Sequence, residues 1–276
     1  MSANAEVLVL VDHADGSVRR TTAEMLTIAR RLGEPSAVFA GPSIDRALES
    51  LREYGAARVY VLDSADLADY LVAPQAEALA QLVDQRSPLA VLVPSSPEGR
   101  EVAARLAVRT GSGLITDAVD VEPGDDGPVT TQSVFAGGFT VRARVRTGTP
   151  IVTVKPNSAT PEPGDGAAAE EHVDVTVSET ARSARVTARE PRTSSGRPEL
   201  TEASIVVSGG RGTGGDFAPV EDLADALGAA VGASGSLFTA TIVFDVCMPA
   251  RCWIAPEMPQ ATYSWGDTVL PVWPTW

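Results

Sequence analysis

The sequence predicts an α/β fold, in which a mostly parallel sheet is covered by helices on both faces. Two observations support this prediction. Short continuous apolar runs alternate with segments of helical periodicity through the first half of the chain, and a glycine-rich turn follows a further apolar run at residues 208–212. A third observation concerns the end of the chain, since all four Trp and both Cys fall after residue 235. The predicted organisation is an N-terminal domain over 1–190, a linker over 191–202, and a partial second domain over 203–276.

Buried parallel strands are expected to be continuous apolar runs. Four runs fit: Glu6–Val11, Ala37–Ala40, Arg58–Leu62 and Leu89–Val93. Apolar residues at helical spacing predict helices between and after them, over residues 21–32, 43–51, 71–83 and 98–109. Gly33 is expected to end the first helix and Ser43 to cap the second. Alternation of strand and helix makes the N-terminal domain Rossmann-like.

After Gly113 the pattern changes to polar–apolar alternation. Residues 129–135 and 140–146 predict two antiparallel strands joined at Gly137-Gly138. Ile151–Val154 predicts one more strand, residues 156–171 a loop, and residues 173–186 a possible further strand.

The second domain begins with a predicted strand at Ala203–Val207, the glycine-rich turn, and a helix. The helix is predicted from an apolar face, whose members are Phe217, Val220, Leu223, Leu227 and Val231. Strand, glycine loop and helix in this order are the start of a nucleotide-binding βα unit. Residues 229–234 lead toward the next strand.

Composition excludes several classes of function. The net charge of −14, from 22 Lys and Arg against 36 Asp and Glu, argues against nucleic acid or an anionic membrane as the main partner. No run reaches 18 apolar residues, so no membrane span is predicted. The first residues lack the pattern of a secretory signal, and Cys247 and Cys252 do not have zinc-site spacing, so we expect a cytoplasmic protein without disulfides.

The main candidate site is the turn Ser208-Gly-Gly-Arg-Gly212. Ligands of open parallel sheets bind at the carboxyl ends of strands. Gly210 and Gly212 would let the backbone approach a phosphate, and the amino end of the following helix would offer N–H groups. Arg211 adds a planar cation suited to a phosphate or an electron-rich ring. Because such turns also occur for steric reasons, the spacing alone supports both interpretations equally.

Other polar residues favour structural roles. His13 is interpreted as a turn histidine and His172 as exposed in an acidic loop. Asp12 and Asp15 are more consistent with shaping a turn than with binding a metal. Ser95, Ser96 and the Glu98–Arg100 segment are expected to cap a helix rather than to hold an anion. The sequence shows no Ser/His/Asp or Cys/His set, so no hydrolase chemistry is predicted.

Several segments together resemble the alpha subunit of electron transfer flavoprotein. They are Ser208–Gly212, Gly232–Ser234, Val93–Ala107, Thr110–Leu114, Phe135–Phe139 and Thr147–Asn157. The resemblance covers residues 1–234. It implies a heterodimer with a beta subunit and one flavin adenine dinucleotide (FAD), contacted by Arg211 and Ser234 of this chain. It also implies an electron carrier rather than a catalyst with its own substrate, taking electrons from acyl-CoA dehydrogenases toward a quinone oxidoreductase and the respiratory chain.

The family's later flavin motifs, QVGQTG and GISGAIQH, are absent from the chain, but an antisense reading of the chain's possible codons permits QVGQTG and contains GISGAIQ. For Pro271–Trp276, every codon choice, reverse-complemented and shifted by one base, translates as Gln/His-Val-Gly-Gln/His-Thr-Gly. The same operation on Arg251–Ala261 gives a segment that contains GISGAIQ, and residues 237–250 permit RAGMQTSKTIVAVN. Three motifs in one register and in the family's order indicate that residues from about 235 to 276 translate the wrong strand, through a genomic inversion or a misassembly.

This interpretation predicts a native-like segment at 203–234 and a non-native tail at 235–276. It explains the clustered Trp residues (Trp253, Trp265, Trp273 and Trp276), which we expect to be exposed or poorly packed. The chain as written is therefore predicted to be impaired in FAD binding. Two alternatives stay open: a non-redox remnant that pairs with the beta subunit without flavin, and a Rossmann-like nucleotide-binding enzyme that uses His13 or Ser95.

Overall fold

The computed structural model describes residues 5–62, 64–135, 137–188, 196–200, 203–233, 244–246, 262–265 and 268–271. The chain divides into two compact units, unit 1 over Met1–Glu190 and unit 2 over Pro191–Trp276. The expectations for Ser234, for Trp253, Trp273 and Trp276, and for both Cys lie outside the described residues, and only the backbone of Trp265 is described.

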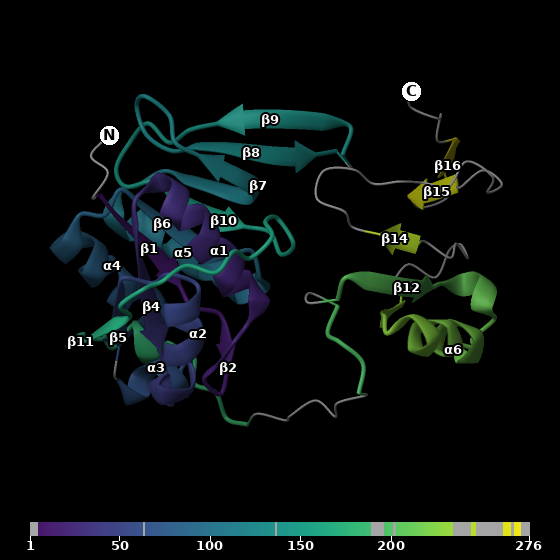
Figure 1. Ribbon diagram of the computed structural model, residues 1–276, viewed down its shortest axis with the longest axis horizontal. Helices are drawn as coiled ribbons and strands as arrows, with labels where there is room; N and C mark the ends of the chain where they lie inside the picture. The colour runs from purple at the N-terminus through teal and green to yellow at the C-terminus, as the bar shows by residue number, and fades with distance from the viewer. Residues whose placement is uncertain are drawn as a thin grey trace. The chain divides into compact units, whose positions relative to one another are not determined.

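Unit 1 is built on a nine-stranded sheet of order β11-β5-β4-β1-β6-β10-β7-β8-β9 (Figure 1). Its strands are β1 Glu6–Leu10, β4 Glu34–Ala40, β5 Arg58–Leu62, β6 Ala90–Pro94, β7 Leu114–Glu122, β8 Val129–Val134, β9 Phe139–Ala143, β10 Ile151–Val154 and β11 Ala169–Val173. The strands from β11 to β7 pair in parallel, whereas β7, β8 and β9 pair antiparallel. The predicted fold class, a mostly parallel α/β sheet with a few antiparallel strands, is confirmed.

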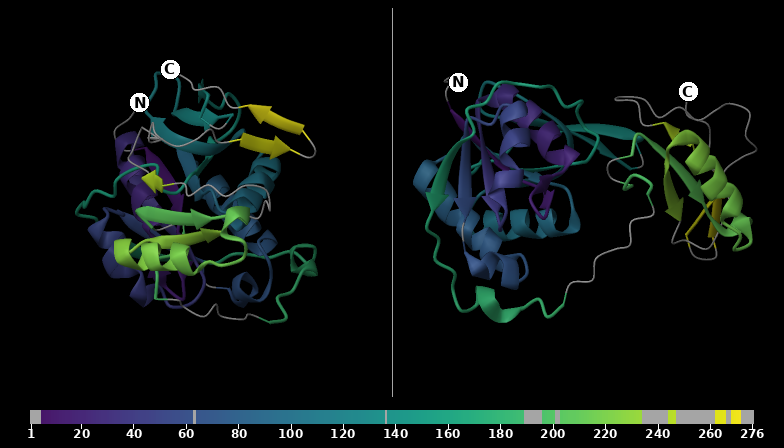
Figure 2. Two further views of the ribbon diagram at one scale, coloured as in Figure 1. Left: turned by 90° about the vertical axis from the view of Figure 1, so that its right-hand side faces the viewer. Right: turned by 60° about the horizontal axis from the view of Figure 1, so that its bottom comes forward.

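Helices cover both faces of this sheet (Figures 1 and 2). They are α1 Arg20–Leu32, α2 Leu48–Glu53, α3 Ala65–Asp69, α4 Ala73–Arg86 and α5 Pro97–Thr110. The side chains of β1 alternate between two cores, because successive residues of a strand point to opposite faces. Val7 and Val9 join the core that holds α1 and α2, while Leu8 and Leu10 join the core that holds α4 and α5.

Several local predictions are confirmed and others are wrong. Gly33 follows the last residue of α1, and its N–H donates to the carbonyl of Ala29 at 2.9 Å. Ser43 does not cap a helix: its backbone is left-handed (φ 70°), and a short 3-10 turn, η1 Ile44–Arg46, precedes α2. Part of the segment predicted as a loop, residues 156–171, forms the edge strand β11, whereas residues 174–186 form no strand and contain the 3-10 turn η2 Ala181–Ser183.

Unit 2 contains a three-stranded sheet of order β13-β12-β14 and one helix. Its elements are β12 Ile205–Gly209, the 3-10 turn η3 Arg211–Thr213, α6 Ala218–Leu227, β13 Ala230–Ala233 and β14 Phe244–Val246. β13 pairs with β12 in parallel and β14 pairs with it antiparallel. Val231 therefore belongs to a strand, not to the helix face on which the sequence placed it. A hairpin of β15 Thr262–Trp265 and β16 Thr268–Pro271, and in unit 1 the small hairpin of β2 His13–Ala14 and β3 Ser17–Val18, complete the described elements.

Candidate functional site

The glycine-rich loop of unit 2 lies at the carboxyl end of β12, as predicted, and leads into α6 (Figure 1). The carbonyl of Gly210 accepts hydrogen bonds from the backbone N–H of Thr213 (3.1 Å) and from its hydroxyl (2.9 Å). The N–H of Asp216 donates to the carbonyl of Thr213 at 2.9 Å. The loop therefore satisfies part of its own backbone hydrogen bonding internally.

The glycines of this loop have two different physical roles. A Cβ at Gly209 would lie 2.9 Å from the Phe217 ring and 3.0 Å from the Thr213 methyl group, so this glycine lets the strand approach α6 closely. Gly214 (φ 58°) and Gly215 (φ 91°) adopt backbone conformations that side-chain-bearing residues rarely take, and open space lies beside each. The steric interpretation thus explains Gly209, while Gly214 and Gly215 leave a surface that a ligand can approach.

The amino end of α6 is acidic and already capped. The Asp216 carboxylate accepts the backbone N–H of Ala218 at 3.0 Å, and Glu221 stands in the first helical turn, followed by Asp222. Free backbone N–H groups and the positive end of the helix dipole favour the binding of an anion. The carboxylates disfavour it, because Asp216 already accepts one N–H group and because their negative charges repel an anion. The expectation that this end offers N–H donors to a phosphate is therefore wrong for Ala218. Sequence reasoning missed Asp216, although an Asp two residues before a helix is a capping signal.

Carboxylates of α6 are also used for an internal contact. Arg197 binds Asp225 through two hydrogen bonds of 2.6 and 2.9 Å, and lies 3.9 Å from Glu221. The hydrogen bonds from Arg197 hold the pKa of Asp225 below its ordinary value and raise the pKa of Arg197. This pair fastens the segment before β12 to the helix.

The candidates in unit 1 are held in structural contacts. The His13 ring stacks on Phe39 with centroids 4.3 Å apart, lies 3.1 Å from the Ala40 carbonyl, and accepts the N–H of Gly16. Asp12 accepts the Thr21 hydroxyl at 3.0 Å. These contacts support structural roles for His13 and Asp12, although His13 lies in the short strand β2 and not in a turn.

Ser95 and Ser96 begin the connection from β6 to α5. The Ser96 hydroxyl caps α5 by accepting the N–H of Gly99 at 3.0 Å, as predicted. The Ser95 hydroxyl contacts the Asp117 carboxylate and receives a hydrogen bond from Thr153 at 3.2 Å. His172 is exposed, as expected, but it lies on β11 and not in a loop. The His13 ring and the Ser95 hydroxyl are both engaged by contacts within unit 1.

Within the part of the chain that the structure describes, no group of three or more His, Cys, Asp or Glu is placed to hold a metal ion. A search of the described helices finds none with the length and apolar character needed to cross a membrane.

Comparison with known proteins decides the family. A model of the electron transfer flavoprotein domain matches residues 7–180, and a model of the electron transfer flavoprotein FAD-binding domain matches residues 199–245. The chain belongs to the electron transfer flavoprotein alpha-subunit family. The alpha subunit of Mycobacterium leprae is 47% identical over 236 residues, which cover 83% of this chain and 72% of the relative. The alpha subunits of Mycobacterium tuberculosis (48% over 235 residues) and Bacillus subtilis (30% over 236 residues) are covered to the same shares.

Membership in this family, whose FAD-binding domain model matches unit 2, identifies electron transfer with FAD as the chemistry to which the loop relates. Gly210, Arg211 and Gly212 lie inside the matched segment. The amino end of α6, which follows the loop, presents the carboxylates of Asp216 and Glu221.

Proposed function

We propose that this chain descends from an electron-carrying alpha subunit, that it retains the surface for pairing with a beta subunit, and that as written it is impaired in FAD binding. In the intact family member, electrons would pass from acyl-CoA dehydrogenases and related flavoenzymes toward a quinone oxidoreductase and the respiratory chain. The protein's part in such chemistry is to position the flavin and to tune its ring through hydrogen bonds.

One observation carries the proposal. The chain matches the FAD-binding domain model at the β12 loop, but from about residue 235 the possible codons of its residues, read on the opposite strand, accommodate the family's later flavin motifs. Arg211 and Ser234 are the flavin contacts that we propose to be retained, with Gly210 and Gly212 beside them. A flavin held by so few groups would exchange readily, because affinity depends on the sum of positioned contacts and on a preformed site.

Co-expression with the family's beta subunit tests this proposal. We expect the complex to form and to lack the flavin absorbance band near about 450 nm. The matched control is the same chain with the codons of residues 235–276 inverted to their forward translation and continued to the natural stop. The control should bind close to one FAD per heterodimer. A stoichiometric yellow complex of the chain as written would overturn the proposed impairment, and failure of both chains to bind the beta subunit would overturn the proposed pairing.

Sequencing the genomic DNA in one long read across the codons of residues 229–276 separates the two origins of the tail. A forward segment there would make the tail an assembly error and the protein an ordinary flavin-binding alpha subunit. A true inversion would mean that the gene encodes the chain as written, for which we expect no bound flavin and no electron transfer.

A further inference from the structure

Residues 174–186, here called the strap, connect the edge strand β11 to the chain that leads into unit 2. The strap forms no strand, yet Val177 is 6% exposed and Ala181 is 4% exposed. A segment without sheet pairing must satisfy its backbone polar groups in another way. Its partners are side chains of α4 and backbone groups of the α3–α4 connection.

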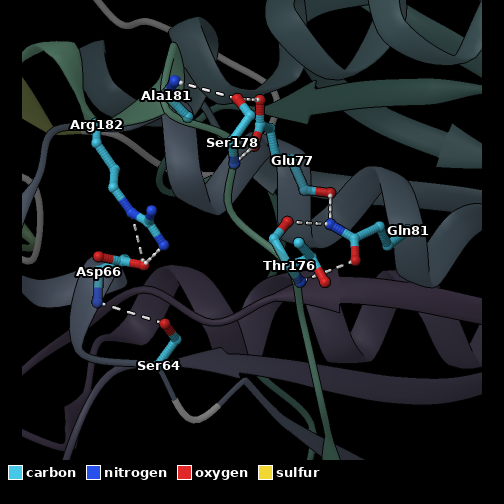
Figure 3. A network of polar contacts seen from close by, with 8 residues as sticks. All are labelled: Ser64, Asp66, Glu77, Gln81, Thr176, Ser178, Ala181 and Arg182. Carbon is cyan, nitrogen blue, oxygen red and sulfur yellow. Dashed lines mark hydrogen bonds and ion pairs between the residues drawn. The ribbon is translucent and has the colours of Figure 1, made fainter.

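Glu77 of α4 is the central anchor (Figure 3). Its side chain is buried, and its two carboxylate oxygens accept the backbone N–H of Ser178 at 2.8 Å and the Ser178 hydroxyl at 2.6 Å. The Arg109 guanidinium of α5 binds the same carboxylate. Burial opposes ionisation of Glu77, but the Ser178 hydrogen bonds and Arg109 outweigh it and hold the pKa of Glu77 below its ordinary value. Glu77 therefore binds the strap as a carboxylate.

Two further contacts flank this anchor (Figure 3). One turn along α4, the Gln81 amide donates to the Thr176 carbonyl at 2.7 Å and accepts the Thr176 N–H at 3.1 Å. Near the other end of the strap, Arg182 binds Asp66 of α3 through hydrogen bonds of 3.0 and 2.7 Å.

Backbone pairing with the α3–α4 connection completes the attachment. The N–H of Leu71 donates to Ala184 at 3.0 Å, and the N–H of Val186 donates to Asp69 at 2.8 Å. The chain between the two units is also fastened at its unit 2 end, where Arg197 binds Asp225 of α6. Each unit therefore holds its own end of the chain that joins them.

We propose that the strap is a clamp that limits how far unit 2 can move from unit 1, and that Glu77 is its positioning residue. The limit follows from covalent geometry. With both ends fastened, the chain from Val186 to Arg197 can span at most about 40 Å, because an extended residue covers about 3.4 Å. If the strap detaches back to the end of β11 at Val173, the same calculation gives a span of about 80 Å. This inference rests on contacts within each unit and is independent of whether flavin is bound.

Hydrogen exchange followed by mass spectrometry on the full chain tests the clamp, with Glu77→Gln as the main variant. Glutamine keeps the size of Glu77 but removes the charge that binds Arg109 and Ser178. Amides of residues 175–186 are expected to exchange at least about tenfold faster, while β1, β4 and β6 stay protected, because local opening reports local stability. The maximum dimension from small-angle scattering should also increase.

Asp84→Asn is the matched control, since Asp84 is an exposed acid on α4. If Glu77→Gln destabilises the whole of unit 1, Gln81→Ala and Ser178→Ala each remove strap contacts and leave Glu77 in place. Unchanged exchange of residues 175–186 in all three strap variants would overturn the clamp. The clamp would also be contradicted if Asp84→Asn accelerated hydrogen exchange of the strap as much as the strap variants do. A strap variant whose strap exchanges faster but whose maximum dimension stays the same would contradict it as well.

Discussion

The two units begin with the same local design, an apolar strand followed by a turn and a helix, but they differ in how far the design is completed. In unit 1, β1 is flanked by β4 and β6, and its side chains join buried cores on both faces of the sheet. In the described part of unit 2, β12 carries one helix, and its buried cluster consists of Val207, Val220, Ala224 and Ala229.

This difference leads us to expect that a correct local sequence is not sufficient for a stable domain. Stability scales with the apolar surface removed from water, and a strand in a doubly wound sheet removes it on two faces. The β12–α6 segment has a side-chain hydrogen bond to the first helical N–H, close strand–helix packing at Gly209 and an apolar face. Beyond residue 235 the described residues add only β14 to this sheet, and on our proposal the family's remaining motifs are not encoded there in the forward direction.

The largest expected effect is a difference in cooperative unfolding between fragments that contain one unit each. A fragment of residues 5–188 should unfold in one cooperative transition by circular dichroism, because it contains both cores of unit 1. A fragment of residues 196–276 should show no such transition, since its described core is too small to offset the conformational entropy of folding. A cooperative transition in the second fragment would remove the basis of the comparison.

Most of unit 1 could be predicted from the sequence because its signals are local. Four apolar runs and the helical periodicity between them place β1, β4, β5, β6, α1, α4 and α5 within a few residues. The position of β10 between β6 and β7 could not be predicted, since strand order depends on contacts distant in sequence. β11 was missed because its residues, Ala-Glu-Glu-His-Val, are mostly polar and exposed, as suits an edge strand.

The site could be predicted only in part. The glycine loop and its position after β12 followed from the sequence, whereas the acidic amino end of α6 was visible in the sequence but was not weighed against a phosphate. Ser43 failed as a cap for a reason that residue type cannot show, because its backbone is left-handed and its hydroxyl makes no capping hydrogen bond.

Removing the Glu77 carboxylate should have the next largest effect, and this effect should be on the stability of unit 1 alone. Glu77→Ala should lower the free energy of unfolding by about 3 kcal/mol at neutral pH, because it leaves the Arg109 and Ser178 donors without their acceptor. The pKa of Glu77 is lowered in the folded state, so its contribution is present above the unfolded value of about 4.5 and is lost as the pH falls through the folded pKa.

Urea unfolding of the wild type and of Glu77→Ala across this pH range measures the effect, and the difference between the two should shrink with acid. Glu24→Gln is the informative control, because burial raises the pKa of Glu24 despite its contact with Arg20. The free energy of unfolding of the wild type, relative to that of Glu24→Gln, should rise as the pH falls, which is opposite to the change expected for the Glu77 variant. Parallel profiles for the two variants would refute the assignment of opposite shifts.

A matched pair of valine substitutions measures the two cores directly. Val7 is 0% exposed on β1 and Val207 is 1% exposed on β12, so their static burial is equal. Val7→Ala should lower the free energy of unfolding of unit 1 by about 2 kcal/mol, from lost burial and the resulting cavity. Val207→Ala should leave that transition unchanged, as followed by urea unfolding of the full chain. An equal loss in both variants would show that the units unfold as one.

The smallest effect concerns the helix start that the sequence predicted correctly. Ser96→Ala should lower the free energy of unfolding by about 1 kcal/mol, because the N–H of Gly99 loses the hydroxyl that caps α5. Ser43→Ala removes the same group from a residue whose hydroxyl caps nothing, so a change near zero is expected there.

In unit 2, Asp216→Ala removes the cap of α6 but also a carboxylate beside the loop, and it should leave the transition of unit 1 unchanged. If the Asp216 variant lowered that transition as much as the Ser96 variant does, α6 would contribute to the stability of unit 1, contrary to the separation of the two units.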